Sequence, residues 1–266
     1  MKKTLSFLKK DILLFIIGLA LVCYPIISGY IQSQEQNDLI STYESTANNL
    51  SNDERTRIYE DAVRWNEALY YQQGGIAMDT DLVYEEVLNI GNGVMGSIEI
   101  PQIDVNLPIY HGTDDSVLNS GAGHLEDSSV PVGGINTHTV ITGHSGLPTS
   151  KLFTRIDELQ KGDLFYIHVL NETMAYEIDT IQTVLPEQAD YSIQDGKDLA
   201  TLVTCTPYGI NSHRLMITGH RVPYDQKDKA ETEKKIPSVR EGIFYILPVI
   251  FIVTGIIIFR KRKESK

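Results

Sequence analysis

The chain has 266 residues, of which 42% are apolar and 22% charged, a composition ordinary for a globular protein and sufficient for one sizeable core. Its net charge is −12 at pH 7, although lysines and arginines gather at both ends, so the part between them is more acidic still. This balance argues against nucleic-acid binding and suits either basic partners or simple solubility.

Two long runs without charged residues lie near the ends of the chain. Residues 12–34 are long enough to cross a bilayer at about 20 residues per span. The alternative for this run is a cleaved signal peptide. The run is longer than the apolar region of a signal peptide, and no Ala-x-Ala site follows it. Residues 242–259 are near the lower length limit for a membrane span. Alternatively, this second run is a signal for attachment to lipid or to the cell wall. Because basic residues flank both runs on their outer sides, we expect two spans, cytoplasmic termini and an extracellular part of about residues 35–240.

The segment after the first apolar run is predicted to form two helices, about 34–49 and 52–72. Ser51 and Glu54 fit a capping box, in which the N-cap side chain and the glutamate three residues later satisfy each other's backbone groups. Residues 76–92, after two glycines, look irregular. One apolar stripe, which we expect to pack on the following domain, has helical spacing and comprises Ile58, Ala62, Trp65 and Leu69.

From residue 93 the sequence changes to short β-like runs separated by Gly, Pro and Asn. Many short strands at this spacing predict an all-β barrel or sandwich, with one short helix near 150–159. Residues 223–241 are polar and charged and indicate a linker. The predicted strands are 95–100, 103–109, 138–142, 164–169, 174–184, 199–205 and 213–218.

A hairpin near the end of this β-rich region carries the candidate chemistry. It places Cys205 at the end of one strand and Arg214 at the start of the next. Because the other cysteine lies in the first apolar run, Cys205 is unpaired in the exported part, which indicates either a reactive thiol or a small buried side chain. A catalytic thiol needs a basic or cationic neighbour. Spacing does not choose between His144 and His124, both flanked by glycines.

No cofactor or metal site is expected. The sequence contains no dinucleotide fingerprint and no Walker loop. Its histidines lack the clustered His and Cys spacing that metal ligands usually show.

The sequence resembles the sortases, the transpeptidases of Gram-positive bacteria. Residues 201–207 (Thr-Leu-Val-Thr-Cys-Thr-Pro), followed by Arg214, are similar to the family signature, and residues 142–144 (Thr-Gly-His) to its histidine motif. Residues 143–148 and 205–209, with the two apolar runs, resemble class C, the pilus-building subgroup. The resemblance covers about residues 93–221 and includes, in the same order, residues 96–103, 107–112 and 121–125.

The resemblance implies a mainly β fold, an eight-stranded sortase-type barrel with short helices, preceded by N-terminal helices and flanked by two transmembrane helices. The domains would be a cytoplasmic tail with the first membrane helix (1–34), an extracellular helical, lid-like segment (35–92), the catalytic barrel (93–222), the linker (223–241) and a second membrane helix with a basic tail (242–266). The protein would lie in the plasma membrane with its barrel outside.

The resemblance also implies roles that general chemistry supports. Cys205 would attack the Thr–Gly carbonyl of a Leu-Pro-x-Thr-Gly-like sorting signal and form a thioacyl enzyme. His144 would protonate the leaving amine and then deprotonate the incoming one. Arg214 would donate hydrogen bonds to the oxyanion or the substrate backbone. His124 is expected to be structural, and His213 to lie on the opposite face of its strand from Arg214.

The acceptor distinguishes the competing functions. A pilin lysine would give an isopeptide bond and a pilus, a peptidoglycan amine would attach surface proteins to the wall, and water would make the protein a hydrolase. Outside the enzymes, the alternative is a surface adhesin or pilin that is itself anchored, although no Leu-Pro-x-Thr-Gly precedes the C-terminal apolar run.

One feature of class C sortases is missing. Their Asp-Pro-aromatic lid usually precedes the barrel, but this chain has no proline between Pro25 and Pro101. Asp79 or Asp81 with Tyr84 could imitate a lid. Without the rigid Asp-Pro turn we do not expect lid-type autoinhibition.

Overall fold

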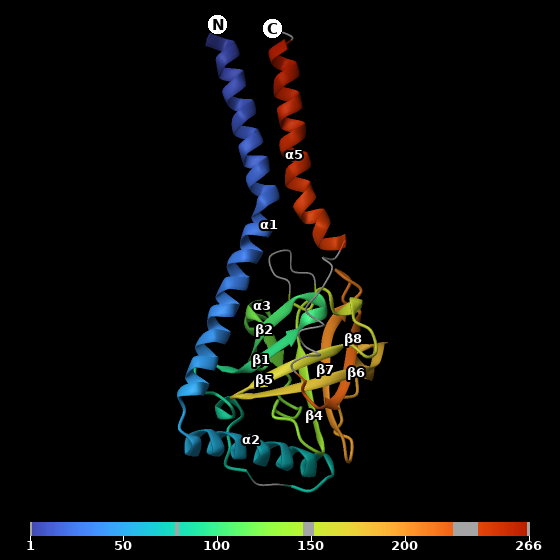
Figure 1. The fold of residues 1–266 in the computed structure, drawn as a ribbon. Coiled ribbons are helices and arrows are strands. Elements are labelled where there is room, and N and C mark those ends of the chain that lie inside the picture. Colours follow the sequence, from blue (N-terminus) through green and yellow to red (C-terminus); the bar gives the residue numbers. More distant parts are fainter. Residues whose placement is uncertain (1, 78–79, 146–151, 226–238, 265–266) are drawn as a thin grey trace. The chain divides into compact units, whose positions relative to one another are not determined.

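The computed structural model describes residues 2–77, 80–145, 152–225 and 239–264 (Figure 1). The chain forms two compact units. One contains α1 (Lys2–Asn49) up to Gln32 together with α5 (Val239–Glu264). The other begins at Ser33 and contains the rest of α1, a second long helix and all of the strands.

The first unit holds the two apolar runs as helices. The rings of Phe15 and Phe251 stack with their centroids 5.0 Å apart. A Cβ at Gly18 would lie 2.8 Å from the Phe251 ring, so the absent side chain permits this close packing. Among the described residues only α1, from Ile12 onward, is long and apolar enough to span a membrane, because the apolar part of α5 covers only Ile246–Ile258. A second span therefore stays a prediction.

The helix α2 (Asn52–Gln73) begins at the predicted capping box. The Glu54 amide donates to Ser51 Oγ over 3.2 Å, and the Ser51 amide donates to Glu54 Oε2 over 3.0 Å. Within the predicted stripe, Ala62 is buried, and Ile58 and Trp65 pack against the main core. The expectation that this helix packs on the following domain is confirmed.

Eight strands form a closed barrel in the order β1-β2-β3-β4-β7-β8-β6-β5 (Figure 1), which confirms the predicted fold class. Neighbours are antiparallel except for the parallel pairs β2–β3 and β4–β7. The strands are β1 (Val94–Ile100), β2 (Val105–His111), β3 (Ala122–His124), β4 (Thr137–Thr142), β5 (Leu164–Val169), β6 (Glu172–Val184), β7 (Asp198–Thr206) and β8 (His213–Val222).

The short elements differ most from the prediction. The helix expected near 150–159 is wrong: residues 150–151 lie outside the described residues, and the chain then makes turns and one 3₁₀ turn, η3 (Ile156–Glu158). The three-residue strand β3 was not predicted, because so short a strand shows no period. The remaining short elements are η1 (Tyr84–Glu86), η2 (Pro101–Ile103), α3 (Asp115–Ser120) and η4 (Pro186–Gln188).

Strand alternation gives the barrel two different faces. Leu202 and Ile217 belong to the main core, whereas Val203 and Met216, their neighbours in sequence, form a smaller cluster with Val140 on the opposite face. Successive side chains of a strand point to opposite sides, so every second residue beyond Val203 returns to the outer face. The candidate site lies on this outer face, next to the outer cluster (Val140, Val203 and Met216).

Candidate active site

Cys205 and Arg214 face each other across the β7–β8 hairpin. They are direct partners in the antiparallel ladder, one pair beyond Thr204 and Leu215 and two beyond Val203 and Met216. Residues two positions apart share a face, so both side chains lie on the side of the outer cluster. Both are partly exposed, as a reacting thiol and an anion-binding guanidinium require. The predicted juxtaposition on the hairpin is confirmed.

His144 follows β4, which runs parallel to β7. Past the end of the strand, the Gly143 amide still donates to the Val203 carbonyl over 3.0 Å. Thr204 Oγ1 donates to the Gly143 carbonyl over 2.6 Å, and Ser145 Oγ donates to the Cys205 carbonyl, also over 2.6 Å. The residues on both sides of His144 are therefore bonded to the end of β7, and we call these two side-chain bonds the clasp. The clasp holds the backbone of His144 beside that of Cys205.

A glycine is required before His144. A Cβ at Gly143 would lie 2.7 Å from the Phe153 ring. The Phe153 amide donates to the His144 carbonyl over 3.0 Å, so the chain that resumes at residue 152 lies against His144. The glycine before the histidine in the sequence motif is therefore explained by the close packing of Gly143 on Phe153, and not only by the accessibility of His144.

Arg214 is not used in an ion pair with any carboxylate among the described residues. Its Nη1 donates to the carbonyls of Asn211 and His213, both over 3.3 Å, within its own loop. These long bonds to neutral acceptors leave the positive charge unneutralised. A developing negative charge beside Cys205 would be the natural acceptor for such a group. His213 pairs with Thr206 and precedes Arg214, so alternation puts it on the opposite face, as expected.

His124 is a core residue. Its Nδ1 lies 2.8 Å from the Tyr84 hydroxyl and its Nε2 lies 2.9 Å from the Ser129 carbonyl. Burial lowers the pKa of its ring to about 4, so it is neutral near pH 7. The expectation that His124 is structural is confirmed. In the described part of the chain, no three His, Cys, Asp or Glu side chains are grouped in a way that would hold a metal ion.

Tyr84 does not act as a lid here. Its side chain is buried in the main core, where its hydroxyl bonds to His124 and accepts from the Gly112 amide over 3.0 Å. Cys205 lies on the other face of the barrel wall. Asp81 is largely exposed and lies 3.8 Å from Arg64, while Asp79 is outside the described residues. The idea that Tyr84 imitates a lid aromatic is wrong, because that ring is an anchor of the segment after α2.

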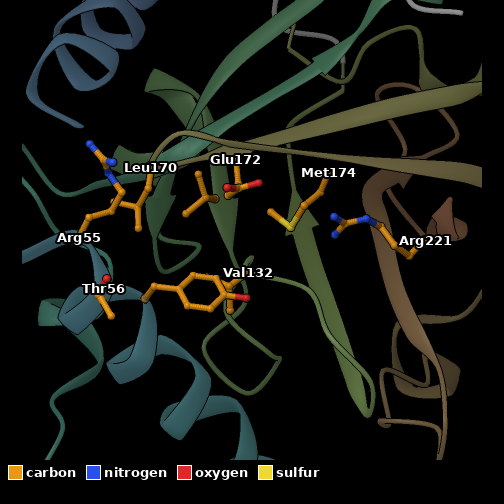
Figure 2. Close-up of a pocket in the computed structure, with 9 residues that line it drawn as sticks. Arg55, Thr56, Val132, Leu170, Glu172, Met174 and Arg221 are labelled. Carbon is orange, nitrogen blue, oxygen red and sulfur yellow. The ribbon is translucent and has the colours of Figure 1, made fainter. Parts of the chain in front are cut away.

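A separate pocket of about 300 Å³ lies between the start of α2, the β5–β6 hairpin and the end of β8 (Figure 2). Arg55 and Arg221 stand at its two ends, but Arg55 Nη2 donates to the Ala47 and Leu50 carbonyls and so supports the end of α1. Arg221 lies at the end of β8 remote from Arg214. This pocket is therefore distinct from the candidate site. It is lined by Arg55, Thr56, Tyr59, Val132, Val169, Leu170, Glu172, Met174 and Arg221.

One residue beside the site was not singled out from the sequence. Tyr191, between β6 and β7, packs on the outer cluster, and burial raises the pKa of its phenol, while Arg214 lowers this pKa and Cys205 raises it. Its sequence signal is weak: an aromatic residue inside a polar loop.

Comparison with known proteins agrees with this geometry. The family model described as "Sortase domain" matches residues 98–222. Sortase A of Streptococcus agalactiae is 30% identical over 202 residues, which cover 73% of this chain and 76% of that protein. The chain belongs to the sortase family. Sortases are cysteine transpeptidases, so the protein is an enzyme of that class.

The similar solved structures of this sortase are class C enzymes. Sortase C1 from Streptococcus agalactiae is 41% identical, with a TM-score of 0.65, and the match covers 71% of this chain and 100% of that one. Sortase C from Streptococcus pneumoniae is 43% identical, with a TM-score of 0.63, over 70% of this chain and 97% of that one. Sortase C from Clostridium perfringens, solved with the C-terminal cell wall sorting motif, is 42% identical, with a TM-score of 0.63. The match covers 70% of this chain and 99% of that one.

Proposed function

We propose that this sortase is membrane-anchored, cleaves Leu-Pro-x-Thr-Gly-like sorting signals and joins pilin subunits by isopeptide bonds to a lysine amine. The observation that carries the proposal is the Cys205–Arg214 pair on one face of the hairpin, with the backbone of His144 fastened beside it by the clasp. The class of the similar structures supports it, since the report on the Streptococcus pneumoniae enzyme concerns pilin substrate specificity.

In the first half-reaction Cys205 is the nucleophile. With the thiol proton held by His144, the sulfur attacks the carbonyl carbon between the threonine and glycine of the sorting signal, and the carbonyl electron pair moves to oxygen. Arg214 donates hydrogen bonds to that oxygen, because its charge has no carboxylate partner among the described residues. The C–N bond then breaks, and His144 gives a proton to the departing glycine amine. The product is a thioester on Cys205.

In the second half-reaction an amine resolves the thioester. The lysine nitrogen of a second pilin attacks the thioester carbonyl while His144 takes its proton, and the Cys205 sulfur leaves. The new C–N bond is an isopeptide bond. The apolar parts of α1 and α5 would hold the enzyme in the plasma membrane with both termini in the cytoplasm, which brings the barrel to substrates emerging at the outer surface.

The test uses the full chain in detergent micelles with a sorting-signal peptide and three acceptors: a lysine-bearing pilin, a peptidoglycan-derived amine and water. Mass spectrometry should find a thioacyl adduct on Cys205 and an isopeptide bond to lysine. Cys205→Ala should remove both, whereas Cys23→Ser, which removes the other cysteine, should leave them. Transfer only to the peptidoglycan amine would make the protein a wall-anchoring sortase, and release of acid alone a hydrolase. Full activity of Cys205→Ala would refute the mechanism.

A further inference from the structure

The loop between β6 and β7 lies across the outer face of the barrel beside the candidate site. Its residues Ala189 and Tyr191 pack against the outer cluster. Two of the cluster's members, Val203 and Met216, pair directly with each other two positions before the Cys205–Arg214 pair. Two positions along a strand are about 6.6 Å, so the Tyr191 ring lies within a side chain's length of the candidate site.

This loop is fixed by hydrogen bonds on both sides of Tyr191. Asp190 Oδ1 accepts from the Ser192 amide over 2.9 Å and from its hydroxyl over 2.7 Å. The Ser192 carbonyl lies 3.0 Å from Nδ1 of His138, a buried residue of β4. Because a carbonyl can only accept, that nitrogen carries the hydrogen, and Nε2 accepts from the Thr201 hydroxyl 2.7 Å away. Tyr191 is therefore held on β4 and β7, the strands that lead to His144 and Cys205.

The state of the Tyr191 phenol suits a hydrogen-bond donor. Burial raises its pKa, the Arg214 charge lowers it and Cys205 raises it, so the phenol keeps its hydrogen near neutral pH and lies in the field of both groups. The ring is half-buried. Its hydroxyl makes no hydrogen bond to any residue that the structure describes. The hydroxyl is not among the buried polar atoms without a partner, so water reaches it, and a bound substrate oxygen would replace that water.

We propose that the Tyr191 hydroxyl is a second hydrogen-bond donor, beside Arg214, to the oxyanion that forms when Cys205 attacks the sorting signal. This inference rests on the proposed function. As the S–C bond forms, the carbonyl electron pair moves to oxygen, and that oxygen accepts from the Arg214 guanidinium and the Tyr191 O–H. When the C–N bond breaks, the pair returns to the carbonyl and the amine leaves with the proton from His144. Tyr191 keeps its proton throughout.

The test replaces only the hydroxyl. Tyr191→Phe in the full chain in detergent keeps the packing on the outer cluster and removes the donor. Loss of one oxyanion donor should lower kcat about 100-fold and leave KM within about twofold, because the bond strengthens only in the transition state. Tyr71→Phe, at an exposed tyrosine of α2, is the control and should keep wild-type kinetics. Thermal unfolding of each variant verifies the fold.

A second measurement separates transition-state from ground-state effects. A sorting peptide that ends in an aldehyde should form a hemithioacetal with Cys205, whose oxygen occupies the place of the oxyanion. Tyr191→Phe should weaken inhibition by the aldehyde about 100-fold and leave the affinity for an uncleavable peptide unchanged. A kcat within twofold of wild type, or a rise in KM with unchanged kcat, would overturn the inference alone. A wild type as inactive as Cys205→Ala would overturn the proposed function as well.

Discussion

Acidification should destabilise the barrel through His124. Its Nε2 donates to the Ser129 carbonyl and its Nδ1 accepts from the Tyr84 hydroxyl, so the neutral ring is satisfied, and a second proton would place a positive charge in the buried core. Burial lowers its pKa from 6.5 to about 4 in the folded protein. Between these two values the unfolded chain binds more protons, so stability falls as the pH falls from 6.5 and stops falling below 4. At pH 4.5 the loss from this one ring is on the order of 2–3 kcal/mol.

Trp65 provides the readout, because it is the chain's single tryptophan and its ring lies 5.9 Å from that of Tyr84. Urea unfolding of the detergent-solubilised chain would be followed by its fluorescence at pH 7 and pH 4.5. His124→Gln keeps a donor for the Ser129 carbonyl but does not titrate. Carboxylates are common to both proteins and cancel in the comparison. Wild type should lose roughly 2–3 kcal/mol more than the variant. An equal loss in both, or an NMR titration of His124 near 6.5, would refute the reasoning.

Two further substitutions test the contacts that place the site and the helix. Thr204→Val keeps the shape of a buried side chain but leaves the Gly143 carbonyl unpaired, so it should cost about 1–3 kcal/mol in thermal unfolding and lower turnover. Thr183→Val, on an exposed part of β6, is its control, and equal effects of both would contradict the clasp. Asn66→Ala removes two bonds to the main chain of Val130 and should cost about 2–5 kcal/mol, with faster amide exchange in α2. Unchanged unfolding and exchange would show that this bridge is not needed.

Local patterns in the sequence determined the elements whose causes are local. The capping box at Ser51 depends on residues three apart, and the strands depend on alternation over a few positions, so both could be predicted. The Cys205–Arg214 pair belongs to this class too, because a hairpin brings together residues nine apart in the chain. The family resemblance added the closure into a barrel and the expectation that His144 acts with them.

The tertiary structure alone decided the pairings between distant segments. His144 and His124 are alike in sequence, but the parallel pairing of β4 with β7 fastens the chain at His144 beside Cys205, while His124 bonds to Tyr84 in the core. Tyr84 was considered as a lid aromatic because its place in the core depends on contacts with segments far along the chain. Tyr191 carried almost no signal, since its position follows from the His138–Ser192 bond between two elements. Spacing along the chain does not encode such contacts, because they depend on which strands pair and which face of the barrel each side chain occupies.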